Sequence, residues 1–246
     1  VLKVALITGG SRGIGLEVVK RYVASGYRVV TCSRYSAKWL ESVAQNPDLA
    51  QVDYYEVDVS VEKQVVLLFS ELSKKYHQLD VAVNNASPKL ASAGVFESLE
   101  NSSLKHTLLN DFWSHALCLK HELALMGPGG VVVNISSVNG LRPTPNGAMY
   151  SACKHALEGL TRSVALEAIE KGVRVNAVAP GVTWTSRWDE RAIDKPTIYD
   201  DVSEIVPLKR FADPSEIVDA VEFLTSDKAS YIVGHTLVVD GGVSLK

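Results

Sequence analysis

The sequence predicts one α/β domain in which helices cover both faces of a doubly wound, seven-stranded parallel sheet. Short apolar runs rich in Val and Ile, typical of strands buried on both faces, alternate along the chain with longer segments of helical period. A glycine-rich turn joins the first apolar run directly to a helical segment. With 246 residues, 46% of them hydrophobic, the chain is long and apolar enough to fill one large core.

The apolar runs predict strands at residues 3–8, 28–32, 52–57, 80–84, 130–136, 174–179 and 236–239. Helical periodicity predicts helices near residues 14–25, 37–46, 61–76, 102–126, 149–171 and 214–226. The start of the last helix is well marked, because Asp213 suits the N-cap and Pro214 suits the first helical position. Repeated strand–helix units imply a parallel sheet with right-handed crossovers.

Residues 182–210 form a long irregular connection that contains Trp184, Trp188 and Tyr199. Connections of this length are commonly lids or flexible loops, so we expect a lid over a ligand. Ligands of doubly wound sheets bind beyond the carboxyl ends of the strands. The lid aromatics either line a hydrophobic substrate pocket or anchor the lid to the domain. Both interpretations remain open.

Composition argues against several classes of partner. A formal net charge of −3 gives no basic excess for nucleic acid or an anionic membrane, and no apolar stretch is long enough to span a bilayer. The N-terminal apolar run lacks the basic region and cleavage site of a signal peptide. Cys32, Cys118 and Cys153 are widely spaced and match no metal-ligand pattern. We expect reduced thiols, no bound metal and a cytoplasmic location.

The run Thr8–Gly15, TGGSRGIG, has the form of a phosphate-binding turn. Its glycines at 9, 13 and 15 let the backbone turn tightly and approach a pyrophosphate, and the helix behind them offers free N–H groups. A tight turn without a ligand is the alternative. The dinucleotide interpretation predicts contacts from Gly9, Ser11, Arg12, Gly13, Ile14 and Gly15.

The end of the second strand indicates which dinucleotide binds. Cys32-Ser33-Arg34 offers no carboxylate for the ribose hydroxyls of NAD, whereas Arg34 and Ser33, with Arg12, suit the 2′-phosphate of NADP. One charge-assisted hydrogen bond contributes on the order of 1.5–3 kcal/mol, or roughly a 10- to 150-fold preference. The sequence therefore predicts NADP(H) as the cofactor.

Tyr150 and Lys154 stand four residues apart in a predicted helix and therefore share one face. A nearby ammonium group is expected to lower the tyrosine pKa and bring it into the range of an acid–base catalyst. Ser137 follows the fifth strand and could hydrogen-bond a substrate oxygen on which charge develops.

Together these residues resemble the short-chain dehydrogenase/reductase family over almost the whole chain. Further matching motifs are Asp58-Val59, Asn84-Asn85-Ala86, the run 176–181 (NAVAPG) and Asp240-Gly241-Gly242. For Asp58 and Asn84 the alternatives are a carboxylate that caps a turn and an asparagine that only packs, and both stay open. The resemblance implies a Rossmann fold, a homotetramer or homodimer, and the catalytic tetrad Asn110, Ser137, Tyr150 and Lys154. It also implies that Asn110 anchors a water in a proton relay, and it adds cofactor contacts at Asp58, Val59, Asn85, Ala86, Tyr150, Lys154, Pro180, Gly181, Val182 and Thr185.

Two positions depart from the family pattern. Ser87 stands where the family has glycine, and Pro88 follows it, so the loop beside the nicotinamide is expected to take an unusual course. Cys153, beside the lysine, replaces a small residue and is either a reactive thiol or a packed, inert one, with the inert thiol favoured.

The sequence thus predicts that residues 1–246 form one NADP(H)-binding catalytic domain. It would transfer a hydride between the nicotinamide and a small ketone, aldehyde or secondary alcohol. A 3-oxoacyl-carrier-protein reductase is one alternative, for which Lys120, His121 and Lys171 are candidate docking residues. A non-catalytic NADP-binding redox sensor is the other. Leu117, Leu119, Leu123 and Leu125 fit either a core or a subunit interface.

Overall fold

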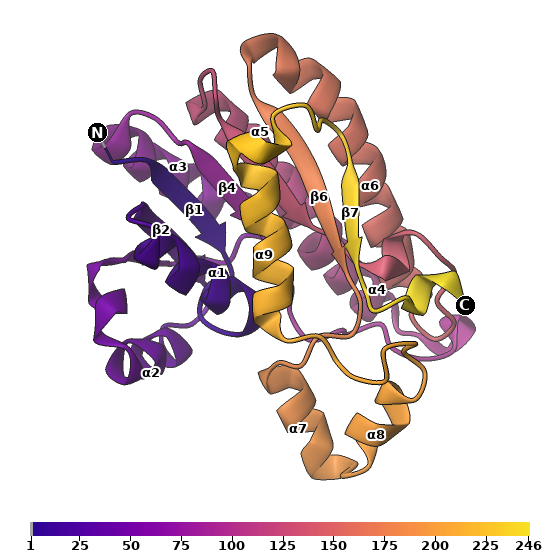
Figure 1. Ribbon diagram of the computed structural model, residues 1–246. Coiled ribbons are helices and arrows are strands. Elements are labelled where there is room, and N and C mark those ends of the chain that lie inside the picture. Colours follow the sequence, from indigo (N-terminus) through magenta and orange to yellow (C-terminus); the bar gives the residue numbers. More distant parts are fainter. Residues whose placement is uncertain (1) are drawn as a thin grey trace.

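The computed structural model describes residues 2–246 and contains a seven-stranded sheet in the order β3-β2-β1-β4-β5-β6-β7 (Figure 1). All neighbouring strands are parallel. The strands are β1 Val4–Thr8, β2 Arg28–Ser33, β3 Asp53–Glu56, β4 Val81–Asn84, β5 Val131–Ile135, β6 Arg174–Pro180 and β7 Thr236–Val239. Each predicted strand is confirmed to within one residue at either end, and the doubly wound parallel fold is confirmed.

Helices cover both faces of the sheet. On one face α1 (Gly13–Ala24), α2 (Ala37–Gln45) and α9 (Pro214–Thr225) bury apolar side chains against the strands. On the other face α3 (Glu62–Tyr76), α5 (Ser114–Leu125) and α6 (Ala148–Ala168) do the same. Leu117 and Leu119 on α5 are buried in this second cluster, and Leu123 and Leu125 pack against it half-buried. Leu117 and Leu119 therefore belong to the core of the chain.

The helix predicted at 102–126 is interrupted. Its first part is α4 (Asn101–Leu108), and a π-helical turn at Leu109–Trp113 separates α4 from α5. Polar side chains bond to the backbone at both ends of this turn. Asn110 Nδ2 donates to the His106 carbonyl at 2.9 Å, and Ser114 Oγ donates to the Asn110 carbonyl at 2.7 Å. Such bonds compete with regular helix geometry, and π turns occur frequently at functional sites.

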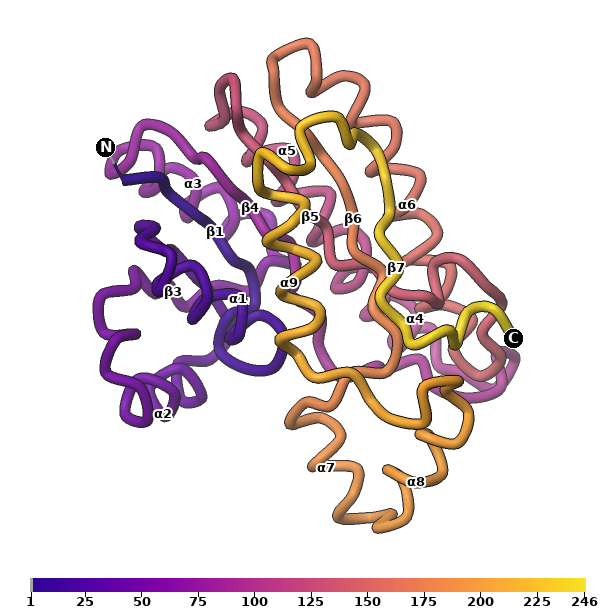
Figure 2. Tube along the Cα trace, viewed as in Figure 1, coloured from indigo at the N-terminus to yellow at the C-terminus, as the bar shows by residue number. Residues whose placement is uncertain are grey.

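The predicted irregular connection at 182–210 is largely helical. After β6 the chain leaves the sheet, forms α7 (Ser186–Asp194) and α8 (Ile198–Ser203), and returns to α9 (Figure 2). Trp184, Trp188 and Tyr199 pack with Phe211, and their ring centroids lie 4.9 to 6.5 Å apart. These aromatics therefore anchor the segment to the domain, as the second interpretation holds, and Trp188 also lines a cleft at the strand ends, as the first interpretation holds.

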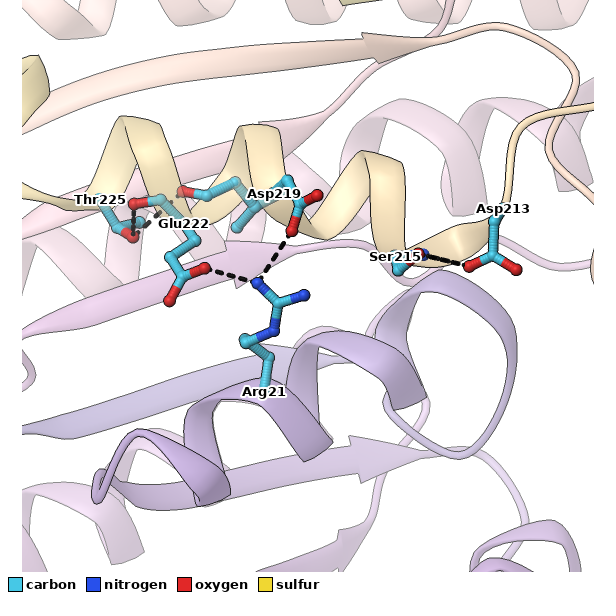
Figure 3. Close-up of polar contacts among 7 residues, drawn as sticks. Arg21, Asp213, Ser215, Asp219, Glu222 and Thr225 are labelled. Carbon is cyan, nitrogen blue, oxygen red and sulfur yellow. Dashed lines mark hydrogen bonds and ion pairs between the residues drawn. The ribbon is translucent and has the colours of Figure 1, made fainter.

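Helices α1 and α9 are also joined by polar contacts. Arg21 on α1 reaches across to the Asp219 and Glu222 carboxylates on α9 (Figure 3). The Tyr22 hydroxyl lies 2.6 Å from Thr225 Oγ1. At the start of α9, Asp213 and Glu216 form a capping box, which confirms the predicted helix start. These contacts hold the first and last helices of the domain side by side. Within residues 2–246, no helix combines the length and apolar character needed to cross a bilayer.

The glycine turn after β1 is packed too closely for larger residues. Gly15 lies so near the preceding turn that an added Cβ would stand 2.3 Å from the Gly9 carbonyl oxygen and 2.4 Å from Asn85 Nδ2. Asn85 fixes the same turn, because its Nδ2 donates to the carbonyls of Thr8 at 3.1 Å and Gly9 at 3.2 Å. Asn85 therefore holds the ends of β1 and β4 together, and glycine at position 15 leaves the space for this contact.

Buried polar side chains join β4 and β5 to α5 and α6 on one face of the sheet. Asn84 Nδ2 donates to Glu122 Oε2 at 2.8 Å and to Asn134 Oδ1 at 3.1 Å, and Asn134 Nδ2 donates to Thr161 Oγ1 at 2.9 Å. Burial raises the pKa of Glu122 to about 8, against the opposing effect of the Asn84 hydrogen bond. The carboxyl is therefore mainly protonated at neutral pH. Asn84 has the packing role that the sequence left open.

We expect Gly15→Ala to destabilise the domain by about 1–3 kcal/mol, because the methyl group would push the Gly9 backbone and Asn85 apart. Gly159→Ala in α6 is the matched control, since an added Cβ there meets nothing within 4 Å. The control should gain about 0.5–1 kcal/mol from helix propensity. Urea unfolding measures the change in the free energy of unfolding for both variants. Equal stability of the two variants would contradict this packing.

Glu122→Gln should change how stability depends on pH. The carboxyl titrates at about 8 in the folded protein and near its ordinary value of 4.5 when unfolded, so unfolding releases a proton between these values. This group therefore makes the wild type less stable as pH rises from about 5 to 8, by up to about 1.4 kcal/mol per pH unit. The variant should lose that component in urea unfolding series, whereas the exposed Glu71→Gln should keep it. Parallel pH profiles for wild type and Glu122→Gln would refute the assignment.

Candidate functional site

A cleft of about 680 Å³ lies at the carboxyl ends of the central strands, where α7 stands beyond the sheet (Figure 1). Nearly all of the site residues expected from the sequence line it. They are Gly9, Ser11, Arg12, Gly13, Ile14, Ser33, Arg34, Asp58, Val59, Asn85, Ala86, Asn110, Ser137, Tyr150, Lys154, Pro180, Gly181, Val182 and Thr185. Gly15 is the exception: it lies behind the turn and acts through packing against Gly9.

One end of the cleft is shaped to hold a diphosphate. Helix α1 begins there, its N-cap residue Arg12 makes no capping hydrogen bond from its side chain, and its first turn carries no acidic residue. The first N–H groups of the helix are thus left for an anion. Gly9 and Gly13 have φ of +73° and +57°, which glycine adopts without strain. A Cβ on Gly13 would also stand 3.3 Å from the Thr185 methyl group, so the turn and the start of α7 approach closely.

Basic side chains gather beside the end of β2. Arg12, Arg34 and Lys38 all line the cleft, and Lys38 is a residue that sequence reasoning missed. The Arg34 guanidinium lies 5.9 Å from the centroid of the Tyr35 ring. Ser33 Oγ lies 2.9 Å from the Tyr54 hydroxyl, so the serine is partly engaged within the protein. Half-buried guanidinium groups at this position suit a phosphate monoester.

Residues that follow β3 and β4 line the cleft and also make hydrogen bonds that fix the local backbone. The Asp58 carboxylate accepts hydrogen bonds from Ser60 N at 2.9 Å and Ser60 Oγ at 2.6 Å. It therefore caps a turn, as the alternative interpretation held, while the residue still lines the cleft. Ala86 N donates to Thr8 Oγ1 at 3.1 Å, and its Cα would lie 2.8 Å from a Cβ on Gly9.

The other end of the cleft brings together Tyr150, Lys154 and Ser137. Tyr150 and Lys154 lie on α6, and Ser137 follows β5. Lys154 is 2% exposed, and its Nζ donates to the Ile135 carbonyl at 3.0 Å. The same Nζ lies 5.7 Å from the centroid of the Tyr150 ring. Gly140 packs against the Lys154 backbone, where a Cβ would meet it at 3.0 Å, so β5, the following turn and α6 are fixed relative to one another.

Burial sets the protonation of the Tyr150–Lys154 pair. It raises the pKa of Tyr150 to about 12, Asp111 raises it further, and the Ser137 hydrogen bond and Arg187 oppose the rise. Burial also lowers the pKa of Lys154, which Asp111 opposes. The expected lowering of the tyrosine pKa by the lysine is therefore not found. Lys154 Nζ is directed to a backbone carbonyl, and desolvation is the largest influence on the pKa of Tyr150.

Asn110 lies in the π turn and lines the cleft, 7% exposed. Its side chain is committed to the His106 carbonyl, and its own carbonyl accepts a hydrogen bond from Ser114 Oγ. The π turn thus positions the Asn110 backbone, which is compatible with the water-binding role that the family resemblance implies.

Two charged residues that the sequence did not predict, Arg187 and Asp111, are both hydrogen-bonded to Ser87. Arg187 on α7 lines the cleft, and its Nη2 donates to the Ser87 carbonyl. Ser87 Oγ donates to Asp111 Oδ1 at 2.6 Å, and Asp111 is 2% exposed. Ser87 is the residue that replaces the family's glycine, and this departure was the one signal in the sequence. It pointed to the loop and not to its charged partners.

The remaining candidates lie outside the cleft or are inert. Burial raises the pKa of Cys153 to about 11, with the thiol 2% exposed, which confirms a packed thiol. Lys120, His121 and Lys171, the docking residues considered for a carrier protein, do not line the cleft. His121 stacks on Phe69 with ring centroids 5.3 Å apart.

Charge is unevenly distributed over the cleft. Its walls carry six basic residues, Arg12, Arg34, Lys38, Arg142, Lys154 and Arg187, and one acidic residue, Asp58. A dinucleotide carrying several phosphate charges would offset part of this excess. The uncapped start of α1 and the glycine turn fit the diphosphate of such a molecule.

Comparison with known proteins agrees with this geometry. A family model described as enoyl-(acyl carrier protein) reductase matches residues 9–244. The chain is 35% identical to L-fucose dehydrogenase of Bos taurus, an alignment that covers 99% of this chain and 90% of that protein. It is 30% identical to the 3-oxoacyl-[acyl-carrier-protein] reductase FabG of Staphylococcus epidermidis, over 98% of both chains.

The structure is similar to that of ElxO solved with NADP bound, with a TM-score of 0.91, 30% identity and full coverage of both chains. The fold, the ordered motifs and these relatives lead to one conclusion: the chain belongs to the short-chain dehydrogenase/reductase family, whose members are oxidoreductases acting on alcohol and carbonyl groups.

Proposed function

We propose that this protein is an NADP(H)-dependent reductase of a small organic ketone or aldehyde, acting in reverse on the corresponding alcohol. The observation that carries this proposal is the single cleft that joins the start of α1 to Tyr150, Lys154 and Ser137. The first feature suits a dinucleotide diphosphate, and the second suits proton transfer to an oxygen atom.

Preference for NADP(H) over NAD(H) rests on the end of β2. Arg34 and Arg12 line the cleft there, and the strand ends without a carboxylate that could bind ribose hydroxyls. The neighbour ElxO has been solved with NADP, which supports the same cofactor. In this arrangement Arg12 would exchange its partner Glu190, 3.3 Å away and exposed, for a phosphate oxygen.

The bound cofactor supplies or accepts the hydride. The residues of this chain then hold the substrate oxygen and move its proton. Ser137 Oγ and the Tyr150 hydroxyl donate hydrogen bonds to the oxygen and stabilise the charge that develops on it during reduction. With a pKa of about 12, Tyr150 carries its proton at neutral pH and is therefore poised as the acid of a reduction. Lys154 would attract the phenolate that remains and bind the nicotinamide ribose.

Two rival functions make different predictions. A 3-oxoacyl-carrier-protein reductase is supported by the similarity to FabG, and it requires turnover of a 3-oxoacyl thioester. A non-catalytic redox sensor would have no need of Tyr150, Lys154 and Ser137 at the cleft. The presence of all three favours catalysis.

The proposal also covers the domain organisation and the oligomeric state of the protein. Residues 1–246 would act as one catalytic domain with α7 and α8 as its lid, and the family resemblance favours a homotetramer or homodimer. The three cysteines are buried and unpaired, as in a protein of the reducing cytoplasm.

Tyr150→Phe should lower kcat by about 10²- to 10⁴-fold, because the ring remains while the proton donor is lost. NADPH binding, followed by fluorescence, should be unchanged. Tyr231→Phe is the control, since Tyr231 is fully exposed and lies outside the cleft. Near wild-type turnover by Tyr150→Phe would remove Tyr150 as the acid.

Arg34→Asp should reduce the preference for NADPH over NADH by roughly 10- to 150-fold in kcat/KM, because a guanidinium that contacts the 2′-phosphate is replaced by a carboxylate suited to ribose hydroxyls. Lys63→Asp makes the same charge change on an exposed residue outside the cleft and should leave the ratio unaltered. An unchanged ratio in Arg34→Asp would place the 2′-phosphate elsewhere.

A further inference from the structure

Arg187 is an unusual feature of the catalytic end of the cleft. It lies in the first turn of α7, lines the cleft, and donates from Nη2 to the Ser87 carbonyl on the opposite wall. Tyr150 and Asp111 are both close enough to act on its charge. A permanent cation therefore faces the region where the substrate oxygen would be bound.

This cation is poorly compensated by the protein. Burial lowers the pKa of Arg187, and repulsion by Arg12 lowers it further, against attraction from Tyr150, Asp111 and Glu190. Over the described part of the chain, Arg187 makes no ion pair at contact distance, and Asp111 is bonded to Ser87 instead. Burying a guanidinium without a carboxylate partner is costly unless a ligand supplies the missing charge.

Other groups around the same end are also short of acceptors. Arg142 and Lys154 line the cleft here, and the Arg142 Nε is buried without a hydrogen-bond partner. The hydroxyls of Thr144 and Ser186, also on the cleft wall, are buried and unpartnered as well. The one acidic residue of the lining, Asp58, belongs to the other end, after β3. Donors and positive charge thus exceed acceptors and negative charge beside Tyr150.

A planar guanidinium with free N–H groups binds a carboxylate through two parallel hydrogen bonds. We propose that Arg187 binds the carboxylate of the substrate, so that the enzyme acts on short oxo acids and the corresponding hydroxy acids. This inference rests on the proposed function, because it places the carbonyl of the oxo acid at Tyr150 and Ser137. Arg187 is then a specificity-determining residue supplied by the lid.

The cofactor diphosphate is the other anion that could meet Arg187. The glycine turn and the uncapped start of α1 already provide its donors. Arg12 acts on the charge of Arg187, but only by repulsion. The groups bonded around Arg187 are Ser87 and, through it, Asp111 on the π turn beside Asn110. The surroundings of Arg187 therefore favour the substrate.

The test compares each acid with its methyl ester at three chain lengths: pyruvate, acetoacetate and levulinate. In the wild type, kcat/KM with NADPH should be higher for at least one acid than for its ester. Arg187→Gln should lower that value for the acid by roughly 10- to 150-fold, mainly through KM, and should affect the ester much less. Arg187→Lys keeps the charge but loses the two parallel hydrogen bonds. Its kcat/KM for the acid should therefore lie between the values of the wild type and of Arg187→Gln.

Arg191→Gln is the matched control, because Arg191 lies on the same helix, stacks over Trp188 at 4.4 Å and does not line the cleft. Thermal melting of each variant checks that the fold is intact. Equal values for acids and esters in the wild type would overturn the inference. So would an Arg187→Gln variant that binds NADPH more weakly and loses acid and ester activity equally, since that pattern assigns the arginine to the diphosphate.

Calorimetric titration of the three acids into the enzyme saturated with NADP⁺ separates this inference from the proposed function. Binding that depends on Arg187, without turnover of any carbonyl, would support the carboxylate site and contradict the proposed reaction. Turnover of neutral carbonyls alone, with no binding of the acids, would support the reaction and contradict the carboxylate site.

Discussion

The close contact between the ends of β1 and β4 is the constraint on which the cleft depends. Strand order reverses at this point, since β1 pairs with β2 on one side and with β4 on the other. Thr8 Oγ1 accepts from the backbone N–H groups of Asn85 and Ala86, and Asn85 Nδ2 returns hydrogen bonds to the Thr8 and Gly9 carbonyls. This contact leaves space for glycine alone at positions 9 and 15. The turn, the start of α1 and the loop at Ser87 thereby receive fixed positions around one crevice.

Burial, more than attraction between neighbours, determines the electrostatics of the catalytic end. It raises the pKa of Tyr150 and lowers that of Lys154, so desolvation favours the uncharged form of each. The lysine ammonium is stabilised by the Ile135 carbonyl and by Asp111. A proton on Tyr150 and a cation nearby are what reduction of a carbonyl requires, because the developing negative charge is then met by both.

Helix α7 adds charge to this arrangement. Aromatic packing of Trp184, Trp188 and Tyr199 on Phe211 fixes α7 over the strand ends, and α7 carries Arg187 to the cleft. The aromatics that first suggested a hydrophobic substrate thus hold a cationic side chain in place, and one of them, Trp188, itself lines the cleft. The proposed carboxylate contact is thus placed on α7, whereas the proposed acid–base residues are placed on α6 and after β5.

Local sequence patterns were sufficient to predict the strands, the glycine turn and the pairing of Tyr150 with Lys154, because each depends on periodicity or on fixed spacing. They could not predict the contact between Arg187 and Ser87, which are 100 residues apart. The sequence around an arginine in a polar segment looks the same whether its side chain is exposed to solvent or buried. The hydrogen bond of Lys154 to the Ile135 carbonyl was equally hidden, since a backbone acceptor leaves no mark in the sequence. The helices within 182–210 were missed because their stabilising contacts with Phe211 are tertiary.

The most direct test of the central claim is the steady-state oxidation of NADPH and NADH by the wild-type protein. The carbonyl panel should include ketones, aldehydes, oxo acids and a 3-oxoacyl thioester. We expect turnover of at least one carbonyl compound, with kcat/KM for NADPH well above that for NADH. Tight binding of NADPH without turnover of any carbonyl in the panel would contradict the assignment of Tyr150, Lys154 and Ser137 to catalysis.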